Sequence, residues 1–205
     1  MEGMFIVFEG ITGSGKKTHI KLLAEKLKEK GKEVTVISFP NYESEIARLT
    51  KRADLDAYTQ SLLFAADRSL YQERIKALLE KGSIILCDRY CYSNFAYQAA
   101  KGLPLEWLVE IEKNTIKPKI VFLIDVPVEI SMNRVRQLSI EDFTKKEILE
   151  RLEREKSFLE KIREIYLSLA VTDKETKWFV INGSEDISVN HEKIWEKVKE
   201  ELKLE

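Results

Sequence analysis

The sequence predicts an α/β fold, with a doubly wound five-stranded parallel sheet and helices on both of its faces. Three observations lead to this prediction. Five short runs of apolar residues alternate with longer stretches whose apolar residues recur at helical spacing. The short runs are apolar throughout, which is typical of parallel strands covered on both sides. Polar residues and glycines follow these runs directly, at the sheet edge where doubly wound folds bind ligands.

The expected strands are bounded by charged residues, glycine or proline. They cover Phe5–Glu9, Glu33–Phe39, Ser83–Cys87, Lys119–Asp125 and Trp178–Asn182. The helical pattern predicts helices at 16–30, 56–81, 92–101, 104–116, after Pro127, from about 147 to about 170, and at 187–203. We interpret residues 1–205 as a single domain with a mobile lid around 136–150.

The composition excludes several classes of protein. A hydrophobic content of 44% and a charged content of 34% argue against a disordered chain and against a membrane protein. No apolar run approaches the roughly 20 residues that a membrane-spanning helix needs, so we expect a cytoplasmic protein with no membrane partner. The net charge of −1 gives no general attraction to nucleic acid, so we expect no nucleic-acid partner either.

The segment after the first strand has the pattern of a phosphate-binding loop. Its glycines let backbone N–H groups turn toward an anion, the following helix adds the positive end of its dipole, and Lys16 can reach phosphate oxygens. Only the last position of G-x-x-x-x-G-K-[ST] departs from the pattern, because Lys17 stands there and Thr18 follows. The fold is therefore expected to be of the P-loop NTPase type. The predicted ATP-binding residues of this segment are Gly10, Ile11, Thr12, Gly13, Ser14, Gly15, Lys16, Lys17 and Thr18.

Two further groups of residues could carry chemistry. Asp88 and Arg89 follow the third strand, where the carboxylate could hold Mg²⁺ directly or through water and the guanidinium fork suits a phosphate. The alternative is a surface ion pair. Phe64 and Arg68 lie four residues apart on one helix face, where they could stack on a base and bond its edge, or be a core residue beside a surface residue. Asp125 also follows a strand, and we expect a structural role for it.

Several motifs occur in the order and spacing that is found in thymidylate kinases. They are the loop with its preceding Phe-Glu-Gly, Phe39-Pro40-Asn41-Tyr42, Leu-Leu-Phe-Ala-Ala-Asp-Arg at 62–68, Asp88-Arg89-Tyr90, Ser93-Asn94-x-Ala96-Tyr97, and the late helix with Phe158-Leu159 and Tyr166-Leu167-x-Leu169-Ala170. The sequence resembles this family over nearly its whole length. The resemblance implies transfer of a phosphoryl group from ATP to dTMP with Mg²⁺, and a homodimer.

The resemblance also implies roles for individual residues. The implied catalytic residues are Lys16, Asp88, Arg89 and Arg151, with Asp88 at the Mg²⁺. The implied dTMP-binding residues are Thr12, Phe39, Pro40, Tyr42, Phe64, Arg68, Arg89, Asn94 and Tyr97. Arg134 would lie against the adenine of ATP. Arg151 would approach the transferring phosphoryl group from the lid.

Two departures from the family pattern leave alternatives open. Thr12 stands where an acidic residue is usual, which motivates a kinase of the same fold for another monophosphate such as dUMP or UMP. Lys17 stands where Ser or Thr is usual, and an ammonium cannot ligate a cation, which motivates a nucleotide-binding protein without catalysis. A nucleic-acid-binding module is disfavoured by the balanced charge.

Overall fold

The computed structural model describes residues 3–52, 54–136 and 145–204, and for residues 145–154 it describes only the backbone. The described residues form a five-stranded sheet in the order β2-β3-β1-β4-β5, with every pair of neighbours parallel. The strands are β1 (Met4–Glu9), β2 (Val34–Ser38), β3 (Ile84–Asp88), β4 (Ile120–Asp125) and β5 (Lys177–Asn182). The predicted α/β class and parallel sheet are confirmed.

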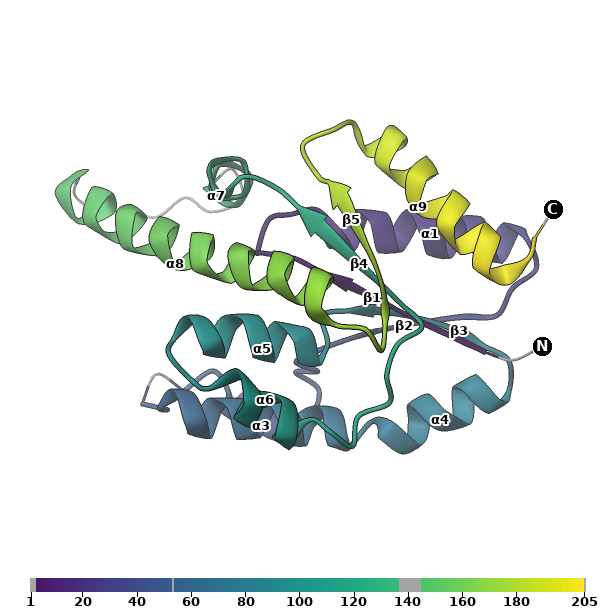
Figure 1. Cartoon of the computed structure of the whole chain (residues 1–205), viewed down its shortest axis with the longest axis horizontal. Coiled ribbons are helices and arrows are strands. Elements are labelled where there is room, and N and C mark those ends of the chain that lie inside the picture. The colour runs from purple at the N-terminus through teal and green to yellow at the C-terminus, as the bar shows by residue number, and fades with distance from the viewer. Residues whose placement is uncertain (1–2, 53, 137–144, 205) are drawn as a thin grey trace.

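Helices cover the sheet on both faces (Figure 1). Helices α1 (Lys16–Glu29) and α9 (Ile187–Leu202) pack on one face. The other described helices are α2 (Glu45–Leu49), α3 (Ala57–Ser69), α4 (Gln72–Glu80), α5 (Cys91–Ala100), α6 (Leu105–Ile111), α7 (Val128–Arg136) and α8 (Lys145–Thr172). Of these, α4, α5 and α8 form the layer on the opposite face, with α3 and α6 outside α5.

The apolar strands divide their side chains between two buried clusters. In β1, Phe5 and Val7 join the cluster under α5 and α8, whereas Ile6 and Phe8 join the cluster under α1 and α9. All four side chains are at most 2% exposed. This explains why β1 reads as a continuous apolar run, because both of its faces are covered.

The neighbouring strands β1 and β3 send their chains to opposite faces of the sheet. The chain leaves β1 through α1 on one face, and it leaves β3 through α5 on the other. Their C-terminal ends therefore diverge and leave a crevice, as at the switch point of other doubly wound sheets. The predicted loop of residues 10–18 and the Asp88-Arg89 pair begin on either side of this crevice.

The helix expected at 56–81 is interrupted, which corrects the prediction. Helix α3 ends at Ser69 and α4 begins at Gln72. The Arg68 carbonyl accepts from the Tyr71 backbone N–H at 3.0 Å and from the Gln72 side chain at 2.8 Å, so the last turn of α3 is tied to the start of α4. The break lets α3 stay beside α5 while α4 packs on β3.

One expectation concerns a segment that the structure describes only in part. The predicted lid around 136–150 falls largely on residues outside the described side chains, and its mobility stays a prediction. The backbone of α8 begins at Lys145, within that range. Among the described residues, every helix is too short or too polar to cross a membrane.

Candidate active site

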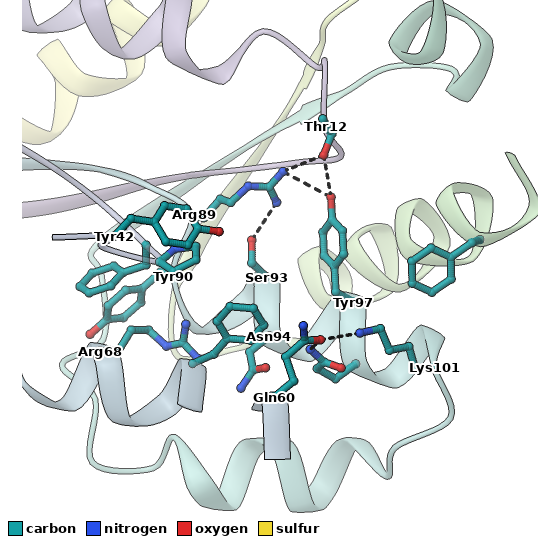
Figure 2. Close-up of a pocket in the computed structure, with 15 residues that line it drawn as sticks. Thr12, Tyr42, Gln60, Arg68, Arg89, Tyr90, Ser93, Asn94, Tyr97 and Lys101 are labelled. Atoms are coloured by element: carbon teal, nitrogen blue, oxygen red, sulfur yellow. Dashed lines mark hydrogen bonds between the residues drawn. The ribbon is translucent and has the colours of Figure 1, made fainter. Parts of the chain in front are cut away.

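A cavity of about 300 Å³ lies at the crevice between β1 and β3, extending toward α3, α5 and α8 (Figure 2). All of the predicted dTMP-binding residues line it. The same walls include Gln60, Tyr90, Ser93, Gln98, Lys101 and Phe158, which the sequence analysis did not assign. The fold thus brings together residues from distant parts of the chain in one pocket, and their contact with a substrate stays a prediction.

Gly10 and Gly13 occupy positions of the loop at which a side chain would not fit. Both have positive φ angles, of 139° and 78°. A Cβ at Gly10 would lie 2.5 Å from the Ile124 carbonyl oxygen, and one at Gly13 would lie 2.7 Å from the Ser131 carbonyl oxygen. The loop is therefore pressed against β4 and α7 in a curled conformation that favours glycine. Such a curl directs backbone N–H groups toward an anion.

Lys16 is folded into the loop that it follows. Its ammonium donates to the carbonyl oxygens of Gly10 and Ile11, each at 3.0 Å, and to Ser14 Oγ at 3.3 Å. The side chain is 6% exposed. Burial, with the nearby positive charge of Arg89, lowers the pKa of Lys16 to about 7, while the Asp88 carboxylate opposes this shift. A phosphate in the loop would favour the charged form of Lys16.

The remaining loop residues differ in exposure. Ile11 and Ser14 are buried, whereas the side chains of Thr12, Lys17 and Thr18 are exposed. Gly15, the N-cap of α1, also has a positive φ. Lys17 therefore lies on the solvent side of the first turn of α1, where its charge adds to the positive end of the helix dipole.

Arg89 lies between the loop and the cavity (Figure 2). Its Nη2 donates to Thr12 Oγ1 and to Tyr97 Oη, each at 3.3 Å, and its Nη1 donates to Ser93 Oγ at 3.2 Å. The guanidinium carbon is 5.2 Å from the centroid of the Tyr97 ring. One cation is thus held by hydroxyl groups from the loop and from α5, which leaves its charge available to an anion between them.

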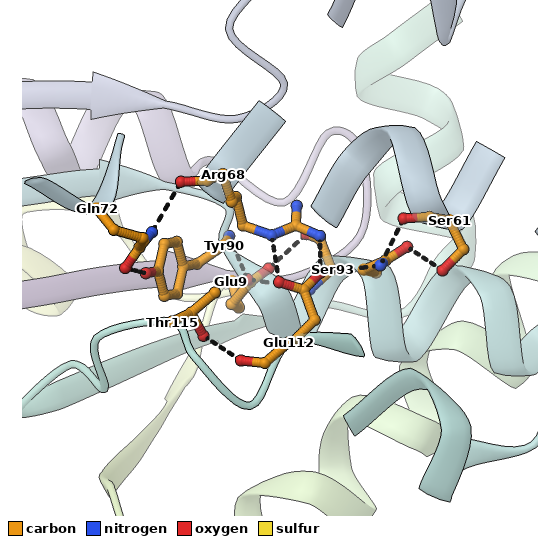
Figure 3. Close-up of polar contacts among 9 residues, drawn as sticks. Glu9, Ser61, Arg68, Gln72, Tyr90, Ser93, Glu112 and Thr115 are labelled. Carbon is orange, nitrogen blue, oxygen red and sulfur yellow. Dashed lines mark hydrogen bonds and ion pairs between the residues drawn. The ribbon is translucent and has the colours of Figure 1, made fainter. Parts of the chain in front are cut away.

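Arg68 forms a buried ion pair with Glu112, the residue that follows α6 (Figure 3). Its Nε donates to Glu112 Oε2 at 3.0 Å, and its Nη2 bonds Oε1. Asn94 Nδ2 also donates to Glu112 Oε1, at 3.0 Å, and to the Ser61 carbonyl at 3.2 Å. Glu112 therefore fixes both Arg68 and Asn94. The Asn94 amide, expected to face the base, is largely used inside the protein.

Phe64 lines the same cavity as Phe39, Pro40 and Tyr42 of the 39–44 turn. It belongs to neither apolar cluster of the described residues. This favours the predicted stacking platform over a core residue.

Asp67, which is 1% exposed, accepts from the Asn41 backbone N–H at 2.8 Å and from Ser44 Oγ at 2.6 Å. Asp67 thus ties the turn that carries Tyr42 to the helix that carries Phe64.

Comparison with known proteins identifies the family of this chain. A sequence profile described as thymidylate kinase matches residues 8–194. The chain belongs to the thymidylate kinase family. It is 40% identical to a probable thymidylate kinase of Thermococcus kodakarensis, over 93% of this chain and 95% of that one. It is 37% identical to a thymidylate kinase of Plasmodium falciparum, over 99% and 91%, and 38% identical to one of Thermosipho africanus, over 90% and 92%.

Asp88 fits the metal position that this family membership implies. It ends β3, is 8% exposed, and its Oδ1 is buried without a hydrogen-bond partner among the described residues. Within the described part of the chain no three His, Cys, Asp or Glu side chains form a ligand cluster. This donor set suits Mg²⁺, which is usually bound by one or two carboxylates together with waters and phosphate oxygens.

Arg134 joins the loop to the turn that follows β5. Its Nη1 donates to the Ser14 carbonyl at 3.3 Å, and its Nη2 donates to the Gly183 carbonyl at 2.9 Å. The guanidinium therefore bridges the loop and the residue that follows β5, and its predicted contact with adenine stays a prediction. Arg151 belongs to the backbone of α8, but its side chain lies outside the described residues, and its predicted role stays untested.

A group of polar residues that was not predicted from the sequence also lines the cavity. Gln98 Nε2 and Lys101 Nζ both donate to Gln60 Oε1, at 3.1 and 2.6 Å. Gln98 is 1% exposed, and its Oε1 has no hydrogen-bond partner within the described part of the chain. Helical spacing could have predicted these residues, because Gln98 lies four residues after Asn94 and Lys101 lies four residues after Tyr97 on the same helix.

Proposed function

We propose that this protein transfers the γ-phosphoryl group of ATP to dTMP, giving ADP and dTDP. The observation that carries this proposal is the position of Arg89. Its guanidinium donates both to Thr12 of the phosphate loop and to Tyr97 of the cavity wall. An acceptor phosphate beside Arg89 would therefore be directed at the terminal phosphate of a nucleotide in the loop.

The donor side is suited to ATP. Backbone N–H groups of the loop and the N-terminus of α1 form an anion site, and Lys16 can neutralise charge on the β- and γ-phosphates. Asp88 would hold Mg²⁺ directly or through water, and the ion would supply positive charge to neutralise the phosphates. Lys17 cannot ligate the ion. Arg134 would lie against adenine.

The acceptor side is suited to thymine. Phe64 offers a flat apolar face for stacking. The N–H groups of Arg68 that Glu112 does not use are donors for the thymine O4 acceptor, and the buried Gln98 Oε1 is an acceptor for the N3–H donor. Cytosine presents an amino donor in place of O4, so this pattern would disfavour it. This assignment transfers base recognition from Asn94, whose amide is occupied, to Gln98.

The sugar would lie beside Thr12 and Tyr97. Their hydroxyl groups are 3.3 Å apart, and the Tyr97 ring closes the space beside the sugar, where a 2′-hydroxyl would be crowded. Thr12 can bond the 3′-hydroxyl without contributing charge. These positions favour a deoxyribonucleotide over a ribonucleotide.

The chemistry requires positioning and charge stabilisation from the protein, with little covalent participation. Arg89 would hold the acceptor phosphate in line with the transferring group. Lys16 would stabilise the charge on that group as it moves, in a site whose burial strengthens each electrostatic contact. Thymidylate kinases are phosphotransferases, and Arg89 and Lys16 are the residues that we propose for the transfer in this protein.

The proposed assembly is a homodimer in the cytoplasm. Apolar side chains of α3 and α6 are exposed, among them Tyr58 at 50%, Leu62 at 49% and Val109 at 42%. Tyr58 also packs edge-on against Trp107, with ring centroids 5.0 Å apart. A second copy would cover this surface, which sedimentation or light scattering would detect as twice the mass of the chain.

The test is a side-by-side assay of phosphoryl transfer from ATP to dTMP, dUMP, UMP, dCMP and AMP. We expect the highest kcat/KM for dTMP. A higher kcat/KM for UMP or dUMP would show that dTMP is not the preferred acceptor, while the proposed kinase activity would stand. Binding of ATP and dTMP with no turnover on any acceptor would show a nucleotide-binding protein without catalysis.

A further inference from the structure

Glu9, the last residue of β1, is a buried carboxylate that the proposed chemistry does not use. Its side chain is 0% exposed. It accepts hydrogen bonds from the Tyr90 and Ser93 backbone N–H groups, at 2.7 and 3.2 Å, from Ser93 Oγ at 2.7 Å, and from Tyr166 Oη at 2.8 Å. Burial raises the pKa of Glu9, while these donors and the charge of Arg89 lower it. A carboxylate with four donors is anchored firmly.

Glu9 caps helix α5 from a neighbouring strand (Figure 3). Tyr90 is the N-cap of α5 and makes no side-chain capping hydrogen bond. The Tyr90 N–H would otherwise lack a partner within the helix, and the Ser93 N–H also donates to the Tyr90 carbonyl at 3.2 Å. The carboxylate also complements the positive end of the helix dipole. The start of α5 is therefore fixed to the end of β1, one residue before Gly10 of the loop.

Ser93 connects this carboxylate to Arg89. Its Oγ donates to Glu9 Oε2 and accepts from Arg89 Nη1 at 3.2 Å. The same Oγ lies 2.8 Å from Tyr166 Oη, which reaches the cluster from α8. The other hydrogen bonds of the guanidinium go to Thr12 and Tyr97 at the cavity wall. Ser93 is thus the contact through which Arg89 is attached to the buried interior.

We infer that Glu9 is a positioning residue, which sets the guanidinium of Arg89 relative to the phosphate loop through the hydroxyl of Ser93. The inference rests on the proposed role of Arg89 at the acceptor phosphate. Donor and acceptor sites then share one anchor, because Glu9 leads directly into the loop and also holds the helix that supports Arg89. Tyr166 holds the same carboxylate from α8, so the position of α8 contributes to the alignment.

The test is a double-mutant cycle with Ser93→Ala and Arg89→Ala, measured as kcat/KM for the best acceptor among the five monophosphates. Ser93→Ala alone should lower kcat/KM on the order of 10-fold, as expected for loss of a hydrogen bond to a charged group. ATP affinity measured by calorimetry should stay within about twofold. In the Arg89→Ala background, Ser93→Ala should have no further effect, because Ser93 acts through Arg89.

Ser83→Ala is the matched control. Ser83 is 0% exposed, precedes β3 at the opposite end of that strand, and its Oγ has no partner among the described residues. This variant should keep the parent kcat/KM, so that any loss in Ser93→Ala is not a general effect of a buried Ser→Ala change. Tyr166→Phe should lower kcat/KM in the same direction as Ser93→Ala and by a smaller factor.

Glu9→Gln keeps the volume of the side chain and should lower kcat/KM at least as much as Ser93→Ala. If Glu9→Gln does not fold, the Ser93 cycle still decides. Full additivity of Ser93→Ala and Arg89→Ala would overturn the inference, as would a Ser93→Ala variant that behaves like Ser83→Ala. Because the cycle uses whichever acceptor is best, a parent enzyme that prefers another monophosphate would refute the proposed substrate and leave this inference open to the same measurement.

Discussion

Removing Glu112 should destabilise the fold and weaken dTMP binding together. The carboxylate is 1% exposed and its partner Arg68 is 2% exposed, so Glu112→Ala leaves a buried guanidinium without its counter-charge. Breaking such a pair costs roughly 3–5 kcal/mol. For a chain of this size about 1 kcal/mol shifts Tm by roughly 2–4 °C, so Tm should fall by roughly 6–20 °C.

A paired replacement separates the two effects. Arg68→Met with Glu112→Gln removes both charges and keeps an amide oxygen that can accept from Asn94. Neutral replacement of a buried ion pair is often close to neutral for stability, so Tm should return to within a few degrees of the parent. The KM for dTMP should stay raised, because methionine offers no donor to the base.

The assay combines thermal unfolding by circular dichroism with initial rates at a temperature below the lowest Tm. ATP affinity is the internal control and should be equal in all three proteins. Recovery of the parent KM for dTMP in the paired variant would refute the contact between Arg68 and the base. A Glu112→Ala protein that melts with the parent would refute the energetic argument for the ion pair.

Four other perturbations test separate parts of the site. The pKa of Lys16 is lowered to about 7, and bound phosphate favours its charged form, so ATP binding should take up protons at about pH 8 and fewer at about pH 6, where Lys16 is already charged. Calorimetry in two buffers of different ionisation enthalpy measures this proton uptake. Equal uptake by the Lys16→Met variant would contradict the prediction. Phe64→Ala should raise the KM for dTMP by about 5- to 100-fold, from the loss of stacking, and an early-melting variant with normal KM would instead make Phe64 a core residue. Thr12→Asp should increase discrimination between dTMP and its 3′-deoxy analogue, because a carboxylate accepts a stronger hydrogen bond, with little loss of ATP affinity; unchanged discrimination would remove Thr12 from the sugar site. Asp67→Ala should weaken dTMP binding and leave ATP binding unchanged, since it frees the 39–44 turn, and Ser44→Ala should do the same to a smaller degree; equal loss of ATP affinity in a titration would count against this.

The strands and the phosphate loop were predictable because their determinants are local. Residues 5–8 are apolar at every position, which follows from burial on both faces of β1. Each glycine of the loop is required by the backbone conformation at its own position. The strand-end positions of Asp88 and Arg89 also follow from the order of elements, because parallel strands place their C-terminal ends along one edge.

The remaining features depend on partners that are distant in the sequence. The interruption between α3 and α4 is accompanied by a Gln72 side chain that also accepts from Tyr90 Oη and from the Ile116 backbone N–H. Glu112 has no motif, and its role appears only when α6 packs beside α3. Asn94 lines the cavity as expected, but its bond to Glu112 was not foreseen, and its contact with a base stays a prediction. Pairings of this kind depend on the tertiary fold, and the periodicity of one helix does not predict which distant element will pack beside it.

The backbone at Arg89 shows how the stability of this protein and its activity make different demands. Arg89 has a φ of 67°, in the left-handed region that costs a residue other than glycine roughly 1–2 kcal/mol. Glycine would relieve that strain, but it would leave the crevice without the guanidinium. A sequence chosen for thermal stability alone would not keep arginine at this position. Stability-guided redesign of the chain should therefore leave residue 89 unchanged.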